Sequence, residues 1–310
     1  MKKIAIAIHG GAGTILKQDL TPELEAAYLS GLQKALDNGY KKLSGGLTAI
    51  DAVLQAVIDL EDNILFNAGK GSVFTKTGKH EMDASIMDGK TLEAGAVAGI
   101  NSIKNPVQLA LDVMKHTEHV MLSGQGALDF AATRNYTLQP DEYFYAEQRY
   151  KQWQLVQGTD TVALDHNIQV KDKKFGTVGA VAVDSDGNIA AATSTGGMTN
   201  KQFGRIGDSP IIGSGTYANN NTCAISCTGH GELFIRAVTA YDVSCLMEYK
   251  GLSLQEAMHI VVHEKLVRIG GEGGMIGVDN NGNTALLFNS EGMYRGVRNS
   301  DGMNEVKIYK

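Results

Sequence analysis

The sequence predicts an α+β fold in which two mainly antiparallel sheets are covered by helices. Strand patterns come in groups separated by groups of helical patterns, whereas a doubly wound parallel fold would alternate strand and helix throughout. Two segments, GAVAVDSDGNIAAAT (179–193) and GMIGVDNNGNTALLF (274–288), have the alternation and the Asx-Gly turns of β-hairpins. Because these hairpins resemble each other, we expect them to pair in one antiparallel sheet.

The first elements are a buried strand and a helix. Residues 3–8 alternate isoleucine with alanine, so both faces of this strand are apolar. Thr21 and Pro22 have the residue types of a helix N-cap and first helical position, and a helix is expected to about residue 38, where Gly39 can end it.

A second helix begins at Thr48, because Asp51 three residues later completes a capping motif and apolar residues follow at helical spacing. The segment LFNAGKGSVF (65–74) leads into a strand, which TKTGK (75–79) turns back into the next one. Similar patterns predict strands over 81–87 and 94–101 and helices over 106–115, 123–131 and 140–156.

Residues 158–174 are polar and lack a sustained period, which predicts a mobile linker up to residue 176. Strands are expected over 177–183, 188–193 and 222–226. One helix is expected after Gly231, and another at Ser253, where Glu256 completes a capping box.

Composition narrows the range of functions. The chain has 310 residues, 43% hydrophobic and 20% charged, with a net charge of −6 and no run of basic residues, so nucleic acid and anionic membranes are not expected partners. No segment approaches the ~18 apolar residues of a membrane helix. Three cysteines argue against a disulfide framework and favour a reducing, cytoplasmic location.

Several familiar motifs are incomplete. HGGAG (9–13) follows a strand but lacks the spacing of a nucleotide-binding loop, so we interpret it as a tight turn. His259 and His263 have the spacing of a zinc-binding helix, yet Ile260 stands where the general base would be. HTEH (116–119) has no second cluster, no GxSxG motif is present, and the cysteines are interpreted as inert buried thiols.

The step from Gly176 to Thr177 is the strongest candidate for chemistry, because a strand begins there directly after an exposed linker. Cleavage in such a linker would leave two intertwined chains intact. A threonine freed at its N-terminus has an α-amine with a pKa near ~8, which can take the proton from its own hydroxyl. Clusters rich in threonine and glycine follow at 193–210 and 227–232, and they include Arg205 and Asp208.

Long blocks of the sequence resemble the plant-type L-asparaginase/isoaspartyl peptidase family of N-terminal-nucleophile hydrolases, especially the bacterial isoaspartyl dipeptidases. The blocks span nearly the whole chain: HGGAG (9–13), LFNAGKGSVF (65–74), MDGKTLEAGAVAG (87–99), GTVGAVAVD (176–184), ATSTGGMTNK (192–201), GRIGDSP (204–210), SCTGHGE (226–232) and FNSEGMYRG (288–296).

This resemblance implies a single αββα four-layer sandwich over residues 1–310, cut by the chain itself into an α subunit (1–176) and a β subunit (177–310). Two such pairs would form an (αβ)₂ dimer. Thr177 would be nucleophile and base, and Thr195 would orient it. Thr228 and Gly229 would form the oxyanion hole.

The resemblance also implies how a substrate would be held. Arg205 would bind the α-carboxylate, and Asp208 with Gly231 the α-ammonium, of L-asparagine or a β-aspartyl dipeptide. No cofactor is expected for catalysis. A structural sodium ion is implied at six main-chain carbonyls: Leu60, Glu61, Asn63, Phe66, Ala68 and Lys70.

Other functions stay open at this level. A glycosylasparaginase-type amidase would use the same nucleophile, and a threonine protease of large proteins would need more surface around its site. A non-catalytic amino-acid-binding protein could keep the pair of Arg205 and Asp208. It would remain one chain, whereas the hydrolase would be found as two pieces.

Overall fold

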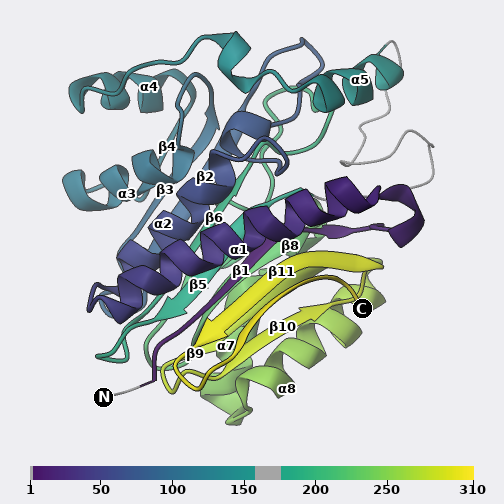
Figure 1. Ribbon diagram of the computed structural model, residues 1–310. Helices are drawn as coiled ribbons and strands as arrows, with labels where there is room; N and C mark the ends of the chain where they lie inside the picture. The colour runs from purple at the N-terminus through teal and green to yellow at the C-terminus, as the bar shows by residue number, and fades with distance from the viewer. Residues whose placement is uncertain (1–2, 158–175) are drawn as a thin grey trace.

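The strands of the computed structural model, which describes residues 3–157 and 176–310, form two sheets (Figure 1). The larger has the order β12-β11-β1-β5-β6-β2-β3-β4 and comprises β1 (Ala5–Gly13), β2 (Met82–Asp88), β3 (Ala94–Ile100), β4 (Met121–Ser123), β5 (Val178–Val183), β6 (Ile189–Thr195), β11 (Gly292–Asn299) and β12 (Asn304–Tyr309). The smaller is antiparallel, with the order β10-β9-β8-β7, and comprises β7 (Thr216–Ala218), β8 (Cys223–Gly229), β9 (Gly273–Asp279) and β10 (Thr284–Phe288).

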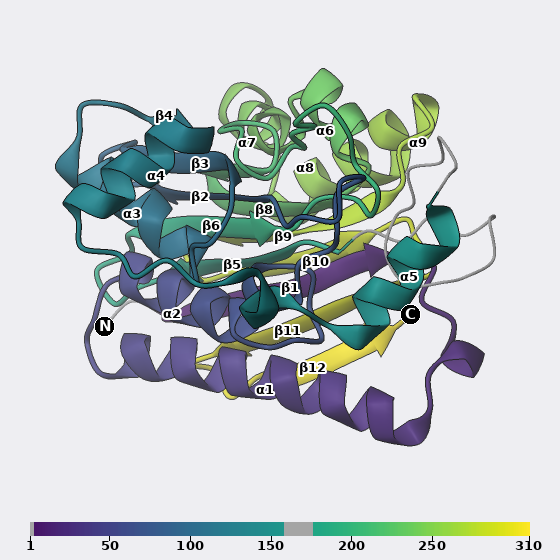
Figure 2. The ribbon, with the colours of Figure 1, turned by 90° about the horizontal axis from the view of Figure 1, so that it is seen from above.

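Helices cover the outer faces of both sheets, as Figure 2 shows. The larger sheet is covered by α1 (Pro22–Ser44), α2 (Ala49–Glu61), α3 (Pro106–His116) and α4 (Gly124–Thr133). The smaller sheet is covered by α6 (Gly231–Ala237), α7 (Thr239–Lys250), α8 (Leu254–His259) and α9 (Leu266–Arg268), with a π-helical segment, η4 (Ile260–Lys265), between the last two. Further elements are α5 (Glu147–Val156) and three 3₁₀ turns: η1 (Lys17–Asp19), η2 (Gly69–Gly71) and η3 (Asp141–Phe144).

The hydrophobic core consists of three clusters of buried residues. One lies between the two sheets, and one lies between each sheet and the helices that cover it. Large aliphatic residues such as Leu32 and Leu36 fill the space between the helices and the larger sheet. Between the sheets the side chains are smaller, as at Ala7, Val181 and Ala191, and this allows the two sheets to approach closely. The expected four-layer α+β sandwich of the N-terminal-nucleophile hydrolase type is confirmed.

The pairing of the two similar hairpins was predicted wrongly. The first hairpin, β5–β6, lies in the larger sheet and the second, β9–β10, lies in the smaller one. Their likeness reflects a shared turn, because the Oδ1 atoms of Asp184 and Asp279 each accept two backbone N–H bonds within their own turn. Turn chemistry determines a hairpin locally, but the sheet it joins depends on distant strands.

Glycines caused two further errors. Helix α1 continues through Gly39 to Ser44, because this glycine is needed for packing: a Cβ there would lie 2.5 Å from Ile6 Cδ1. HGGAG is no turn but the end of β1, with a register shift between His9 and Gly11. A Cβ at Gly10 would lie 2.4 Å from the Phe66 ring, so this part of the motif serves a close approach.

Other differences concern irregular segments. Residues 65–74 form turns and a 3₁₀ segment instead of a strand, and the helix expected over 140–156 is interrupted between Phe144 and Glu147. Strands β11 and β12 were not predicted. The predicted linker lies outside the described residues except for its last residue, Gly176. Within the described parts of the chain, no helix is both long enough and apolar enough to cross a bilayer.

Candidate active site

Thr177 lies directly before β5 in the middle of the larger sheet, and Thr195 is the last residue of the neighbouring strand β6. The antiparallel register pairs Val178 with Ser194, which places the two threonines side by side. Thr177 Oγ1 donates a hydrogen bond to Thr195 Oγ1 at 3.2 Å, and both side chains are buried. The fold therefore brings together the expected nucleophile and the residue expected to orient it.

The carbonyl group of Gly176 accepts two hydrogen bonds. Asn67 Nδ2 donates to its oxygen at 2.8 Å and Thr195 Oγ1 donates at 3.0 Å. Negative charge develops on a carbonyl oxygen when a nucleophile attacks its carbon, and preorganised donors stabilise that charge. The 176–177 peptide bond is thus surrounded by the groups that an attack by the adjacent hydroxyl requires.

Asn67 was not predicted as a functional residue. Its Oδ1 atom accepts from Val73 N at 3.0 Å, while its amide nitrogen also donates to Gly197 O at 2.7 Å. These contacts fix which end of the amide is nitrogen and direct that nitrogen toward Gly176. The only sequence signal was its position within LFNAGKGSVF, one of the blocks shared with the family that the sequence resembles.

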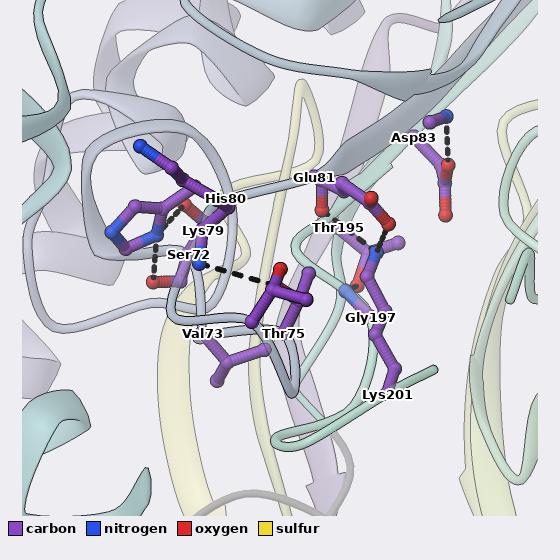
Figure 3. Close-up of polar contacts among 12 residues, drawn as sticks. Ser72, Val73, Thr75, Lys79, His80, Glu81, Asp83, Thr195, Gly197 and Lys201 are labelled. Carbon is purple, nitrogen blue, oxygen red and sulfur yellow. Dashed lines mark hydrogen bonds and ion pairs between the residues drawn. The ribbon is translucent and has the colours of Figure 1, made fainter. Parts of the chain in front are cut away.

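The buried side chain of Lys201 packs next to Gly197 in the turn that follows β6 (Figure 3). Lys201 Nζ donates to Glu81 O at 2.8 Å, and burial lowers the pKa of this lysine. Within the turn, Gly197 N donates to Thr195 Oγ1 at 3.0 Å. Because that oxygen also accepts from Thr177, the only hydrogen of the Thr195 hydroxyl is available for Gly176 O.

A small, partly open pocket lies at the threonine pair. Its lining joins the 176–177 bond to the residues expected to bind substrate, and includes Thr177, Thr195, Arg205, Asp208 and Gly229.

Arg205 is held by a residue that sequence reasoning missed. Its Nε and Nη2 atoms donate to the two carboxylate oxygens of Glu232 at 2.8 and 2.9 Å, a bidentate pair. Glu232 also lies 3.2 Å from His230 Nε2, and its pKa is lowered by the hydrogen bond with His230 and by Arg205. Glu232 occupies one edge of the guanidinium and leaves Nη1 for another anion.

Asp208 is buried beside Arg205. Burial raises its pKa to about 7, against the opposing effect of the Arg205 charge. Its Oδ2 atom has no hydrogen-bond partner among the described residues. A Cβ at Gly231 would lie 2.9 Å from both Asp208 Oδ1 and Arg205 Nη2, so glycine is required between these groups. An ammonium ion would satisfy the orphaned carboxylate oxygen.

The residues expected to form the oxyanion hole end β8. Gly229 lines the pocket, whereas Thr228 is fully buried and its Oγ1 accepts from Ala12 N at 3.2 Å. A Cβ at Gly229 would lie 2.4 Å from the Phe234 ring, which excludes any other residue there. Of this pair it is Gly229 that lines the pocket, while the Thr228 side chain joins the end of β8 to β1.

The carbonyl groups expected to hold sodium belong to the end of α2 and the loop after it. A Cβ at Gly69 would lie 2.6 Å from Glu61 O, and one at Gly71 would lie 2.1 Å from Phe66 O and 2.6 Å from Ile64 O. These two glycines let the backbone oxygens crowd into a single turn. Backbone carbonyls are suitable ligands for hard cations, so the residues present fit a sodium ion.

The side chain of Glu61 links this loop to β6. Glu61 Oε1 accepts from Ser194 Oγ at 2.6 Å and from Val107 N at 3.0 Å, and burial raises the pKa of the carboxyl to about 8. The folded protein therefore keeps a proton that the unfolded chain loses near pH 4.5. The associated stability is fully present below that pH and is lost as the pH rises through about 8.

We accordingly expect Glu61→Gln to flatten the dependence of stability on pH. Between pH 5 and 8 the free energy of unfolding should fall more steeply for the parent protein than for the variant, by up to ~1 kcal/mol per pH unit. Denaturant titrations at several pH values measure this, with both proteins carrying Thr177→Ala so that each is one chain. Parallel pH profiles would contradict it.

Other candidates from the sequence do not form sites. His259 and His263 stack with ring centroids 4.8 Å apart, but the described part of the chain contains no group of three or more potential His, Cys, Asp or Glu metal ligands. All three cysteines are free thiols. Burial raises the pKa of Cys223 to about 12 and raises that of Cys227 as well, so neither is an activated nucleophile.

Comparison with known proteins gives similarity over nearly the whole chain. A family model described as Asparaginase matches residues 2–308. The isoaspartyl peptidase of Escherichia coli (strain K12) is 52% identical over 297 residues, covering 95% of this chain and 92% of that protein. The isoaspartyl peptidase/L-asparaginase of Xenopus laevis is 44% identical, covering 94% and 91%, and the plant-type L-asparaginase of Pyrococcus furiosus is 44% identical, covering 94% of each.

Proposed function

Because the chain belongs to the asparaginase family, it is a hydrolase of β-aspartyl amide bonds, and we propose that Thr177 is its nucleophile after self-cleavage at the 176–177 bond. The observation that carries this proposal is the pair of hydrogen bonds to Gly176 O, from Asn67 at 2.8 Å and Thr195 at 3.0 Å. These donors activate one specific peptide bond, and that bond lies in the pocket with Arg205 and Asp208.

Self-cleavage begins when Thr177 Oγ attacks the carbonyl carbon of Gly176. The C–N bond breaks, the threonine nitrogen takes up the proton, and an ester joins Gly176 to the threonine oxygen. Asn67 and Thr195 stabilise the negative charge on the carbonyl oxygen during the attack. Water then hydrolyses the ester, which leaves a carboxylate on Gly176 and a free amine on Thr177.

The freed amine supplies the base for the second reaction. With a pKa near ~8 it takes the hydroxyl proton of Thr177 as the oxygen attacks the β-aspartyl carbonyl, and it gives a proton to the leaving nitrogen. Ammonia leaves from L-asparagine, and an amino acid leaves from a β-aspartyl dipeptide. Water hydrolyses the acyl-enzyme to L-aspartate, while the backbone at Thr228 and Gly229 stabilises the oxyanion.

Arg205 and Asp208 match the end that both substrates share. The free edge of the guanidinium suits the α-carboxylate, and the orphaned oxygen of Asp208 suits the α-ammonium. The ammonium would favour the ionised form of Asp208 and so oppose the effect of burial, which raises the pKa of this carboxyl. Substrate binding thus supplies the charge partner that this carboxylate lacks.

Intact-mass analysis together with kinetics tests the proposal. We expect the purified protein to contain a fragment that begins TVGAV, and to release L-aspartate from both L-asparagine and a β-aspartyl dipeptide. An intact chain without activity would favour a non-catalytic amino-acid-binding protein. Full activity in a preparation that contains only the intact chain would refute the role of the freed amine.

Replacement of Arg205 by lysine is expected to weaken substrate recognition but not self-cleavage. Lysine keeps the charge and loses the planar fork, so we predict a loss in kcat/KM for L-asparagine of about 2–3 kcal/mol, roughly 30- to 150-fold. Self-cleavage should proceed, because the Arg205 side chain donates to Glu232, whereas Gly176 O accepts from Asn67 and Thr195. Steady-state kinetics and intact mass measure both effects.

The matched variant for this experiment is Glu232→Gln, which keeps the shape of the side chain that holds Arg205 but removes its charge. Because the guanidinium remains, we expect a smaller loss, below ~10-fold in kcat/KM. An unchanged kcat/KM for Arg205→Lys would show that the arginine does not bind the carboxylate.

Assembly, the metal and location complete the proposal. Two αβ pairs would form an (αβ)₂ dimer, which analytical ultracentrifugation of the cleaved protein tests. A sodium ion bound by the carbonyls from Leu60 to Lys70 would stabilise the loop that carries Asn67, and it would take no part in the chemistry. The free cysteines suit a reducing compartment and so support a cytoplasmic location.

A further inference from the structure

A chain of buried hydroxyl groups crosses the space between the two sheets and ends at a histidine. Ser226 on β8 lies 2.9 Å from His9 Nε2 on β1 and 2.7 Å from Thr193 on β6. Thr216 on β7 donates to Thr193 at 2.5 Å, and Ser85 on β2 donates to Thr216 at 2.8 Å. All five side chains are fully buried. This hydroxyl chain connects residues on five strands, and the proposed reaction steps do not use it.

The geometry determines the direction of every hydrogen bond near the histidine. His9 Nδ1 lies 3.0 Å from Thr177 O, a carbonyl oxygen that can only accept, so Nδ1 carries the hydrogen. In a neutral ring Nε2 is then an acceptor, and Ser226 must donate to it. The only hydroxyl hydrogen of Ser226 is used in the bond to His9, so Ser226 accepts from Thr193. Thr193 in turn accepts from Thr216.

Two further observations support this arrangement. Burial lowers the pKa of His9 to about 3, so the ring stays neutral and has one acceptor nitrogen. Gly179, which pairs with His9 across β1 and β5, leaves room for the chain: a Cβ there would lie 2.0 Å from Ser226 Oγ and 2.5 Å from His9 Nε2. The hydroxyl chain thus requires glycine at this position of an otherwise Val- and Ala-rich strand.

We propose that His9 is a positioning residue for the nucleophile, held in its Nδ1–H tautomer by the hydroxyl chain. The proposal rests on the role of Thr177 given above. The ladder between β1 and β5 ends with the pair of His9 and Gly179, two residues after Thr177. Beyond this pair, the His9 imidazole donates to Thr177 O in place of a backbone N–H. It holds the carbonyl from the side of β1, whereas Thr195 lies on the opposite side, on β6.

The other end of the chain reaches the substrate clamp. Ser85 Oγ also lies 2.6 Å from Ser209 O, so its one hydrogen is shared between that carbonyl and Thr216, and Ser209 follows Asp208 directly. The contacts of one hydroxyl chain therefore reach from the backbone of the nucleophile to the backbone next to the carboxylate expected to bind the ammonium group. Both ends must keep their spacing for the attacking oxygen to meet the carbonyl of a bound substrate.

The tautomer can be measured in the parent protein, which avoids any variant that fails to fold. In ¹⁵N-labelled protein, the Nδ1 nitrogen of His9 should be protonated and Nε2 should show the shift of an unprotonated acceptor. Ser226→Ala removes the donor to Nε2 and should change the Nε2 shift. Protonation at Nε2 in the parent protein would overturn the proposal.

Two amide variants, each of which places a nitrogen near the position of one ring nitrogen, test the positioning role. In His9→Asn the amide nitrogen is bonded to Cγ, as Nδ1 is, so a donor to Thr177 O is retained. In His9→Gln the amide extends one bond further, toward Ser226, and that donor is lost. We expect kcat of the cleaved Gln variant to fall at least ~10-fold with KM within ~2-fold, and the Asn variant to stay within ~5-fold of the parent.

The outcomes separate this proposal from the proposed function. Equal kcat values for the Asn and Gln variants, in a parent protein that cleaves itself and is active, would refute the positioning role alone. A parent protein that neither cleaves nor hydrolyses would refute the proposed function, and the NMR measurement would still report the tautomer. Loss of folded protein in both variants leaves that measurement as the deciding one.

Discussion

Thr177→Ala is expected to yield a single chain of 310 residues without hydrolase activity. The substitution removes the oxygen that attacks Gly176, and without that attack no free amine forms at residue 177. The loss should be complete within detection, because both the nucleophile and its base are missing. Intact mass and L-aspartate release measure the two consequences separately.

The neighbouring substitutions distinguish the roles of the hydroxyl and the methyl group. Thr177→Ser keeps the oxygen but loses the methyl that restricts χ1, so it should cleave more slowly and keep weak activity. Thr177→Cys should cleave at least in part, since a thiol can attack Gly176, and should hydrolyse substrate poorly because the site fits a short C–O reach. Hydrolysis by Thr177→Ala with the 176–177 bond intact would place the nucleophile elsewhere.

The fold could be predicted from sequence where the determinants are local. The capping boxes at Thr48 and Ser253 begin helices as expected, because each motif is complete within four residues. The assignment of hairpins to sheets failed, since identical turn chemistry serves β5–β6 and β9–β10 in different sheets. Gly39 was misjudged because its close contact with Ile6 involves residues 33 positions apart, which no local pattern records.

The same contrast holds for the site. Thr177, Arg205 and Asp208 could be identified because the chemistry restricts their residue types at these positions of the shared blocks. Glu232 could not, since a glutamate in the first turn of a helix is ordinary and only the folded chain brings it to Arg205. The glycines of HGGAG were interpreted as the reason for that motif, so no role was predicted for His9. Its role depends on hydroxyl groups from four other strands.

Asn67→Asp is expected to slow self-cleavage more than any substitution outside Thr177. Asparagine supplies an N–H donor to Gly176 O across 109 residues of sequence, and an ionised aspartate presents only acceptors to that oxygen. Removal of one preorganised oxyanion donor costs about 10²- to 10³-fold in rate, or ~2.7–4 kcal/mol. Following the appearance of the fragment TVGAV by mass spectrometry after synthesis gives the rate.

A matched control separates this effect from the mere introduction of a charge. Asn299 is the last residue of β11, and its Oδ1 accepts from Asp301 N and Met303 N at 3.0 Å in the turn that follows, so Asn299→Asp keeps the acceptor and should cleave at the parent rate. If Asn67→Asp also cleaves at that rate, Thr195 alone activates the Gly176 carbonyl. If it cleaves slowly while folding normally, the loop that carries Asn67 is part of the cleavage machinery, and the sodium-binding carbonyls proposed around it would act through the placement of this amide.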